Sequence, residues 1–457
     1  MKILIIGGGI GGYVCAIRAA QLGADVTLAE RKHLGGTCLN EGCIPTKALL
    51  ESAQILDDLK QAESLGIEGI AGGKANMVRM QARKQEIVDQ LVHGVGLLLE
   101  KGNIAHLTAD VRLVDGKTVQ IDGEEKTFDA VILATGSEPV VLPLPGMDLD
   151  GVIDSTDALS MEEIPDTMAI IGGGVIGTEF ASLYTSLGTK VSIIEMMDRI
   201  VPPMDPAISE MLGMTLQARG IRVHTGAAVK EVVEKDGLTV VFEKNGQTQE
   251  VSAQKVLVAT GRRPVTDVLE GAKVQVAMDR RFVRIDQMMR TNVDGLYAIG
   301  DVTGKSMLAH TAMEQGIRCA EAIMGKKTRP IEYGKIPSCL YTQPEAASCG
   351  MTEPVAQEKG LAIEVGIFPL FNNARTLIAD QADNTFVKII AAKDTGELLG
   401  AHIFGPYATE MIGEFALALE LECTAKELID TIHPHPTVSE GLKEGAGSVY
   451  GEAIHSL

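Results

Sequence analysis

The sequence predicts an α/β fold in which two similar units of parallel strands and helices are followed by a third, α+β domain. Three observations predict it: the length of the chain, an internal duplication of one strand–turn–helix pattern, and a change of pattern near residue 336. A chain of 457 residues is too long for one core, because compact domains usually contain about 100–200 residues. Length alone therefore suggests about three domains.

Composition and charge describe a folded, acidic protein. Apolar residues make up 45% and charged residues 22% of the chain, and the 50 glycines without a three-residue repeat point to many tight turns. The formal net charge is −20. Binding a polyanion requires a basic face, so nucleic acid is not an expected partner.

Neither a membrane span nor a secretory leader is expected. No apolar run approaches the roughly 18 residues that a span requires, and glycines interrupt the apolar run 1–6 before any cleavage site. Five of the seven cysteines are scattered, unlike a secreted disulfide framework. We therefore expect a cytoplasmic protein; the scattered cysteines are Cys15, Cys319, Cys339, Cys349 and Cys423.

The first unit begins with an apolar strand over residues 3–6, followed by Gly7-x-Gly9-x-x-Gly12. A helix runs to about Gln21, and a second strand over 26–28 precedes Glu30. Glycines at this spacing permit a tight turn and a close approach to the backbone, while free N–H groups at the helix N-terminus attract a pyrophosphate. The carboxylate after the second strand can accept hydrogen bonds from ribose hydroxyls.

The same design recurs from about residue 168. A strand over 170–171 leads to Gly172-x-Gly174-x-x-Gly177, a helix to about Leu187, and a strand over 191–194 before Glu195. The acidic residue lies at the same distance from the first glycine in both copies. One such motif is weak evidence, since helices also pack through small residues at this spacing. Two copies with acidic strand ends predict two Rossmann-like dinucleotide sites.

Two further motifs close these units. Ala134-Thr135-Gly136 and Ala259-Thr260-Gly261 each follow an apolar strand, and they look like equivalent turns at which the chain leaves the two folds. Residues 142–146 contain two prolines, which continue neither a helix nor a central strand, so we read them as a domain linker. We place the first unit at 1–145 and the second at 146–272, with 273–335 returning to the first.

The third domain is predicted from about residue 336, where the glycine motif no longer occurs. Strands are expected over 386–390 and 399–404, and helices over about 409–421 and after Pro436. This mixture predicts an α+β domain over 336–457.

Two cysteines lie five positions apart in the run Gly35-Gly36-Thr37-Cys38-Leu39-Asn40-Glu41-Gly42-Cys43-Ile44-Pro45-Thr46-Lys47. Five residues of a regular helix rise about 7.5 Å, beyond the roughly 7 Å between Cα atoms that a disulfide tolerates. A bridge therefore needs an irregular helix start, which Gly42 allows. Two ordinary thiols or half of a metal site are the alternatives, but no further cysteine pair or nearby histidine completes four ligands. We predict a redox-active pair and no metal site.

These motifs together resemble the pyridine nucleotide-disulfide oxidoreductases, and the resemblance covers essentially the whole chain. It implies an FAD-binding domain over 1–145 and 273–335, an NAD-binding domain over 146–272 and a dimerisation domain over 336–457. It also implies that Cys38 exchanges with the substrate while Cys43 faces the flavin.

The resemblance assigns roles to further residues. The run 297–301 is similar to a second FAD motif, in which Asp301 holds the ribitol chain. Lys47 and Glu179 resemble an ion pair beside the reactive nitrogen of the flavin, with a solvated surface pair as the alternative. The other cofactor-binding assignments are Gly7, Gly9, Gly12, Glu30, Gly36, Thr37, Thr135 and Gly136 for FAD, and Gly172, Gly174, Gly177, Glu195 and Gly261 for NAD.

The run 433–440 is similar to the acid–base motif of the family, with His435 and Glu440 in the matching positions; a structural histidine is the alternative. Disulfide exchange needs a thiolate, so a base must take and return a proton, and imidazole ordinarily titrates near neutrality. We expect Pro436 to open a helix, Glu440 to orient the ring from its positive end, and His433 to point elsewhere. In the family this pair reaches the cysteines of the other subunit, which implies a homodimer.

The nicotinamide and the substrate are predicted from fewer residues. Glu195 stands where NADP-selective members carry positive charge, and a carboxylate repels a 2′-phosphate, so NAD is preferred. The NAD signal, the cysteine run and residues 400–405 before Glu410 favour the dihydrolipoamide-oxidising members over glutathione, trypanothione and mercuric reductases. The tail 451–457 also lacks the extra cysteine pair of mercuric or thioredoxin reductases.

The dihydrolipoamide prediction implies a lipoyl group on a carrier protein, and membership of a 2-oxoacid dehydrogenase, acetoin or glycine cleavage complex. The alternatives are another disulfide reductase with a glutathione-like substrate, and a flavin-binding interaction protein without catalysis. Three residues depart from the usual family pattern, and Val265 among them has no physical explanation here: Ile10, Val265 and Cys349.

Overall fold

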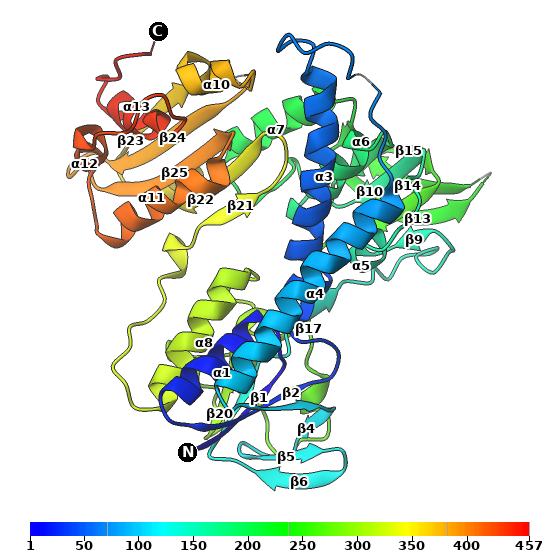
Figure 1. The fold of residues 1–457 in the computed structure, drawn as a ribbon, viewed down its shortest axis with the longest axis vertical. Helices are drawn as coiled ribbons and strands as arrows, with labels where there is room; N and C mark the ends of the chain where they lie inside the picture. The colour runs from blue at the N-terminus through cyan, green and yellow to red at the C-terminus, as the bar shows by residue number, and fades with distance from the viewer. Residues whose placement is uncertain (71, 236, 382, 457) are drawn as a thin grey trace.

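The computed structural model describes residues 1–70, 72–235, 237–381 and 383–456 (Figure 1). It contains the two parallel-sheet units and the third α+β domain, so the predicted fold class is confirmed. Among the described residues, no helix combines the length and the apolar character that crossing a membrane requires.

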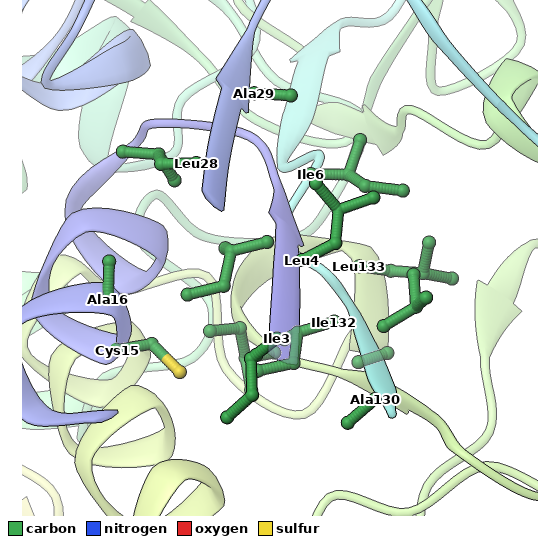
Figure 2. Close-up of a cluster of buried hydrophobic side chains, with 14 of the residues drawn as sticks. Ile3, Leu4, Ile6, Cys15, Ala16, Leu28, Ala29, Ala130, Ile132 and Leu133 are labelled. Atoms are coloured by element: carbon green, nitrogen blue, oxygen red, sulfur yellow. The ribbon is translucent and has the colours of Figure 1, made fainter. Parts of the chain in front are cut away.

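The first unit is a five-stranded parallel sheet in the order β20-β7-β1-β2-β3. Its central strands β1 and β7 are apolar and almost fully buried, and side chains of α1, β4 and β5 belong to the same core. Figure 2 shows side chains of β1, β2 and β7 gathered with Cys15 and Ala16 in this core. The strands are β1 Lys2–Ile6, β2 Asp25–Glu30, β3 Ala105–Thr108, β7 Ala130–Leu133 and β20 Leu296–Ala298.

Two helices on one side of this sheet pack through glycines. In α1 (Ile10–Gln21) and α8 (Ala309–Ile323), a Cβ added to Gly316 would lie 2.6 Å from the carbonyl oxygen of Gly11. The chain thus returns to the first unit after completing the second, through both β20 and α8.

The second unit repeats this design with a parallel sheet in the order β12-β11-β10-β16-β9. An antiparallel sheet, β13-β14-β15, is inserted in the chain between β12 and β16; the sequence patterns did not reveal this sheet. The elements are β9 Val152–Ile153, α5 Ser155–Ala158, β10 Thr167–Ile171, α6 Val175–Ser186, β11 Lys190–Ile194, α7 Pro206–Ala218, β12 Arg222–His224, β13 Ala227–Glu234, β14 Leu238–Lys244, β15 Gln247–Ala253 and β16 Lys255–Val258.

The third domain is an antiparallel sheet, β21-β22-β25-β24-β23, with helices packed against it. Its core is a separate apolar cluster from those of the parallel sheets. The elements are β21 Ser338–Leu340, β22 Glu345–Gly350, α9 Glu353–Glu358, β23 Ile363–Pro369, α10 Ala374–Ile378, β24 Phe386–Ala392, β25 Leu398–Gly405, α11 Ala408–Glu420, α12 Ala425–Asp430 and α13 Glu440–Val449.

Two long helices connect the first two units, α3 (Cys43–Gln61) and α4 (Met77–Lys101). Because α3 contacts both α4 and α6, it holds its N-terminal cysteine segment between the units. The remaining elements are α2 Gly36–Asn40, β4 Val111–Leu113, β5 Thr118–Ile121, β6 Glu124–Thr127, β8 Ser137–Pro139, β17 Arg262–Pro264, β18 Met278–Asp279, β19 Phe282–Val283, and 3-10 helices over Asp267–Leu269, Gly300–Thr303, Tyr333–Lys335 and Leu370–Asn372.

Candidate active site

A cavity of about 1200 Å³ lies between the two parallel-sheet units and extends to β21 of the third domain. This volume exceeds the roughly 300–1,000 Å³ of a pocket for one drug-sized ligand, so there is room for more than one ligand. The cavity is lined by both glycine loops, by the turns after the two apolar strands that end near 133 and 258, and by the cysteine segment. Its lining includes Gly9, Cys43, Gly136, Gly174, Glu195 and Gly261.

The two acidic strand ends have the same hydrogen bonds. Glu30 accepts from the backbone N–H of Gly8 at 2.6 Å and of Lys32 at 2.7 Å. Glu195 accepts from Gly173 at 2.6 Å and from Met197 at 2.7 Å. Each carboxylate therefore holds the middle of its glycine loop, and its two oxygens keep further acceptor capacity for hydroxyl groups.

The glycines of each motif have different tasks. A Cβ on Gly7 would lie 2.2 Å from the carbonyl oxygen of Ala134, and one on Gly12 would lie 1.9 Å from that of Gly7. The second copy repeats this, with Gly172 and Gly177 too close to backbone oxygens for any side chain. Only the middle glycines, Gly9 and Gly174, have no atom within 3.4 Å of an added Cβ, and both line the cavity. The outer glycines close the turn, and the middle ones leave space for a ligand.

The cysteine segment contains a break between two helices. α2 ends at Asn40 and α3 begins at Cys43, while Gly42 is packed so closely that a Cβ would lie 2.9 Å from the carbonyl oxygen of Thr37. The structure has the irregular helix start that the sequence predicts, but with both cysteines as free thiols. The break therefore comes from Gly42 and does not require a bridge.

The two thiols are unequal. A hydrogen bond from Cys38, together with the positive charge of Lys47, lowers the pKa of Cys43 to about 7. The hydrogen bond with Cys43 and burial raise the pKa of Cys38. Cys43 is also the first residue of a 19-residue helix, whose positive end favours a thiolate. When the pair is reduced, the negative charge therefore resides on Cys43.

Lys47 and Glu179 form an ion pair across the cavity wall, joining α3 to α6. The Lys47 Nζ lies 2.9 Å and 3.0 Å from the two carboxylate oxygens of Glu179. The Glu179 side chain is only 5% exposed, and its Oε1 also accepts from the backbone N–H of Tyr341. Lys47 lies 4.5 Å from the centre of the Tyr341 ring. The pair is thus a fixed part of the cavity rather than a solvated surface contact.

Asp301 belongs to a polar network that sequence reasoning did not find. Its carboxylate accepts from the Ser137 hydroxyl at 2.6 Å, and Ser137 in turn accepts from the Arg262 Nε at 2.7 Å. Burial raises the pKa of Asp301. Arg262 also approaches the Thr37 hydroxyl, at 3.5 Å. No sequence signal pointed to this network, because its members come from separate segments that pair only through β8 and β17.

Thr135 and Gly36 occupy different positions from the other cofactor-binding candidates. The Thr135 hydroxyl donates to the carbonyl oxygen of Val265 at 2.6 Å, and Thr135 lines a separate hollow of about 60 Å³ beside Glu30. A Cβ on Gly36 would lie 2.6 Å from the Cα of Gly9, so Gly36 lets the cysteine segment pack against the first glycine loop.

His435 and Glu440 lie in the third domain, and neither lines the cavity that holds the cysteines. The His435 Nδ1 is 3.0 Å from the Glu440 Oε1, and the ring is 72% exposed. His433 points elsewhere, with its Nε2 2.9 Å from Glu414.

The prediction that Pro436 opens a helix is wrong. α13 begins at Glu440, and a turn precedes it in which the Thr437 hydroxyl donates to the carbonyl oxygen of Pro434. The Thr437 N–H donates to the Glu440 Oε2, so Glu440 holds this turn and still lies in the first turn of a helix.

The comparison with protein families shows which family this chain belongs to. The model of the family described as "Pyridine nucleotide-disulphide oxidoreductase" matches residues 1–316, and the model of its dimerisation domain matches residues 336–446. The chain belongs to the pyridine nucleotide-disulphide oxidoreductases. The resemblance read from the sequence motifs is confirmed.

Curated relatives of this oxidoreductase match it along nearly its whole length. A dihydrolipoyl dehydrogenase of Bacillus subtilis is 41% identical, covering 99% of this chain and 98% of the relative. A dihydrolipoyl dehydrogenase of Thermus scotoductus is 40% identical, covering 100% and 98%. Solved structures include LpdA from Mycobacterium tuberculosis, with a TM-score of 0.90, 27% identity, and coverage of 98% of this chain and 99% of that one. The flavoprotein disulfide reductase RclA from Escherichia coli has a TM-score of 0.87, 27% identity and the same coverage.

FAD and NAD are the cofactors of the family, and the cavity of this oxidoreductase fits both. Its two glycine loops each present an open middle glycine and a helix N-terminus to the cavity. Such an N-terminus is a site for a pyrophosphate. One dinucleotide can therefore bind to each loop, with the cysteine segment between the two.

Replacing Lys47 by methionine should raise the pKa of Cys43. The substitution removes the nearby positive charge, and an opposite charge at this range usually lowers the pKa of an anionic group by about 1–3. We expect the midpoint of Cys43 alkylation to move up from about 7 toward roughly 8.5, the ordinary value of a thiol. The measurement is the rate of iodoacetamide labelling of Cys43 in the reduced protein across pH, followed by mass spectrometry.

Lys60→Met is the matched control, because Lys60 lies on the same helix and forms an exposed ion pair with Asp57 at 2.8 Å. Its Cys43 labelling profile should match that of the unaltered protein. An unchanged profile in Lys47→Met would show that Lys47 does not set the charge of the cysteine pair.

Proposed function

We propose that this oxidoreductase oxidises dihydrolipoamide, through a Cys38–Cys43 disulfide and FAD, with NAD as the final acceptor. The observation that carries the proposal is the unequal dithiol at the start of α3, between two glycine loops that open into one cavity. Dihydrolipoyl dehydrogenases at 40% identity or more over essentially the whole chain support the substrate assignment.

In the oxidised protein, one thiol of dihydrolipoamide gives its proton to His435 and attacks the Cys38 sulfur. The Cys38–Cys43 bond breaks, and Cys43 leaves as a thiolate, which Lys47 and the start of α3 stabilise. The second substrate thiol then attacks the mixed disulfide, releasing oxidised lipoamide, and His435 returns a proton to the Cys38 thiolate. The substrate loses two electrons and two protons. The cysteine pair gains the two electrons and, at Cys38, one proton, while the proton of the second thiol passes to His435 and from there to solvent.

The cofactors supply the remaining steps: bound FAD is the two-electron acceptor for the dithiol, and bound NAD is the hydride acceptor beyond it. Cys43 comes from the first unit and Glu195 from the second, so the thiol reaction and the NAD reaction belong to different walls of the cavity. Glu440 holds the His435 ring, since its carboxylate lies 3.0 Å from Nδ1, and Nε2 is then the nitrogen that can exchange a proton.

The assembly is part of the proposal. We propose a homodimer formed by the third domain, in which His435 serves the cysteines of the other copy. Two observations support the dimer: the dimerisation-domain match over residues 336–446, and the absence of any contact between His435 and Cys38 within the described part of one chain.

The substrate is a lipoyl group on a carrier protein, within a 2-oxoacid dehydrogenase, acetoin or glycine cleavage complex of the cytoplasm.

One assay tests the substrate. NAD reduction by dihydrolipoamide is measured beside NADPH oxidation by glutathione disulfide, using the same purified flavoprotein. We expect the first reaction to be at least about a hundredfold faster, because a site built for one partner discriminates strongly against an ill-fitting one. Faster glutathione disulfide reduction would identify a different disulfide reductase, and no turnover in either direction would identify a flavin-binding protein without catalysis.

The coenzyme preference provides a further prediction. By the ratio of kcat/KM, we expect NAD to be preferred over NADP by about a hundredfold, because the Glu195 carboxylate repels a 2′-phosphate. Replacing Glu195 by glutamine should reduce this preference by about tenfold, since the amide keeps one of the two backbone acceptors but loses the charge. Steady-state rates with each coenzyme measure the ratio.

The matched control is Glu30→Gln, in the equivalent position of the other unit with the same two backbone hydrogen bonds. It should lower FAD retention while leaving the ratio between NAD and NADP unchanged. If the preference is the same in Glu195→Gln as in the unaltered enzyme, another residue distinguishes the two coenzymes.

A further inference from the structure

A cluster of ionisable side chains, buried except for the half-buried Glu353, joins the second unit to the third domain. Its four members, Asp205, Glu353, Lys388 and His402, are here called the Asp205 cluster. Asp205 and His402 are fully buried, and the Lys388 side chain is 5% exposed. The Lys388 Nζ lies 3.0 Å from the Asp205 Oδ1 and 2.7 Å from the Glu353 Oε2. The ring of His402 lies 3.8 Å from Asp205.

The position of Asp205 is fixed from both sides. On its own side it caps α7, accepting from the backbone N–H of Ala207 at 3.0 Å. From the third domain it receives Lys388 on β24 and the backbone N–H of Glu353 at 3.1 Å. His402 on β25 is itself held, because its two ring nitrogens lie 3.0 Å from the Ser348 hydroxyl and from the carbonyl oxygen of Met351. Figure 1 shows α7 beside the sheet of the third domain.

Burial of this cluster is better evidence of a fixed geometry than of stability. Removing charged groups from water is costly, and well-packed apolar side chains often stabilise a site equally well. What the charged groups add is a fixed geometry, because only one arrangement of the cluster keeps every charge next to its partner. The cluster therefore fixes where the N-terminal end of α7 lies relative to the third domain.

The segment just before Asp205 borders the cavity. Residues 196–204 connect Glu195 to α7, and Met196, Met197, Pro202 and Pro203 line the cavity on the side of the second glycine loop. This segment is attached to that loop, because the Val201 N–H donates to the carbonyl oxygen of Gly173 at 2.8 Å. Asp205 is the next anchor along the chain. Together with the buried side chains of Ile200, Val201 and Met204, it holds segment 196–204 against the NAD side.

The backbone of this segment is strained. Val201 has a φ of +39°, in the left-handed region that a β-branched residue rarely adopts, and it is fully buried. Such a conformation persists only where the surroundings impose it, and it is frequent at ligand clamps. The hydrogen bond to Gly173 holds Val201 on one side, and the Asp205 cluster holds the chain four residues later.

We propose that Asp205, held by Lys388 and His402 of the third domain, is a positioning residue for the NAD site. It does not touch the coenzyme. It fixes segment 196–204 against the second glycine loop, so that the third domain contributes to NAD affinity through a buried contact. FAD affinity is not affected, because FAD binds the first glycine loop.

The test uses the FAD-loaded enzyme with Asp205→Asn, Lys388→Met and both changes together. Asparagine keeps the cap on Ala207, since it is as good a capping residue as aspartate, and loses the charge together with the second oxygen, which accepts from the Glu353 N–H. The double variant leaves neither a buried lysine nor a buried aspartate without its partner. We expect the dissociation constant of NAD, measured by titration calorimetry, to rise by about fivefold to tenfold in each single variant, a size typical of altered coupling between parts of a protein.

The kinetic readout separates positioning from a general loss of structure. With ferricyanide as acceptor, KM for NADH should rise while kcat and FAD content stay within about twofold, since a misplaced binding segment weakens uniform binding without changing the later step. Neither readout uses dihydrolipoamide, so the result does not depend on the proposed substrate.

Lys393→Met is the matched control. It removes another lysine of the third domain, next to β24, whose ion pair with Glu364 is exposed. Its NAD affinity should equal that of the unaltered enzyme. The proposal is overturned if Asp205→Asn and Lys388→Met bind NAD as Lys393→Met does, or if FAD content and kcat fall in parallel with NAD affinity.

Discussion

Replacing either Cys38 or Cys43 by serine should reduce dihydrolipoamide-dependent NAD reduction by at least about a thousandfold, as expected when the residue that forms the covalent intermediate is removed. A serine oxygen cannot replace a sulfur in the bridge, so the electron pair of the substrate has no path to the flavin. The protein should keep bound FAD and its visible absorbance, because neither sulfur contributes to the glycine loop that holds the cofactor. Steady-state rates and the absorbance spectrum measure the two effects.

Two further measurements make this prediction specific to the pair. Cys423→Ser changes a half-buried cysteine of the third domain and should keep turnover within about threefold, as usual for a change remote from the reacting groups. NADH oxidation by ferricyanide needs no disulfide and should continue in Cys38→Ser and Cys43→Ser. Turnover of dihydrolipoamide in either serine variant would refute the assignment of the redox pair.

The duplicated units were predictable because their requirements are local. Each glycine motif must follow an apolar strand and precede a helix, so the sequence placed the end of α1 at Gln21, where the structure has it. The equal spacing from Gly7 to Glu30 and from Gly172 to Glu195 has a structural cause in the hydrogen bonds of the two carboxylates to Gly8 and Gly173.

Features that depend on distant segments were not predictable in the same way. The network of Asp301, Ser137 and Arg262 forms only when β8 pairs with β17. The Asp205 cluster likewise combines residues that are far apart in the sequence and share no motif. The helix after Pro436 was placed too early, because the hydrogen bonds of Thr437 favour a turn there over a first helical turn.

The third domain has two connections to the chemistry in this view. Through the Asp205 cluster it contacts the start of α7 in its own chain, and in the proposed dimer His435 serves the cysteines of the other copy. Formation of the dimer is then a condition for the thiol half-reaction but not for coenzyme binding. The two connections can be changed separately by mutation. His435 lies on an exposed turn of the third domain, whereas Asp205 is fully buried at the start of α7.

Replacing His435 by alanine should reduce dihydrolipoamide-dependent turnover by about 10²–10⁴-fold, the usual contribution of a positioned acid–base group. The ferricyanide reaction with NADH should be unchanged, because it involves no thiol. His433→Ala is the matched control, since His433 lies two residues away and pairs with Glu414. Equal losses in the two variants would show that the effect is on the fold of the turn and not on proton transfer.

Mixing subunits decides which cysteines His435 serves. A heterodimer of one Cys38→Ser chain and one His435→Ala chain contains one site with both an intact cysteine pair and an intact histidine only if each site uses residues from two chains. After dissociation and random reassembly of equal amounts, half of the dimers are heterodimers with one such site each, so activity should recover to about a quarter of the unaltered value. If His435 served its own chain, every site would lack one group and the mixture would stay inactive. Mixing two batches of Cys38→Ser alone should also give no activity, which excludes recovery caused by the reassembly procedure.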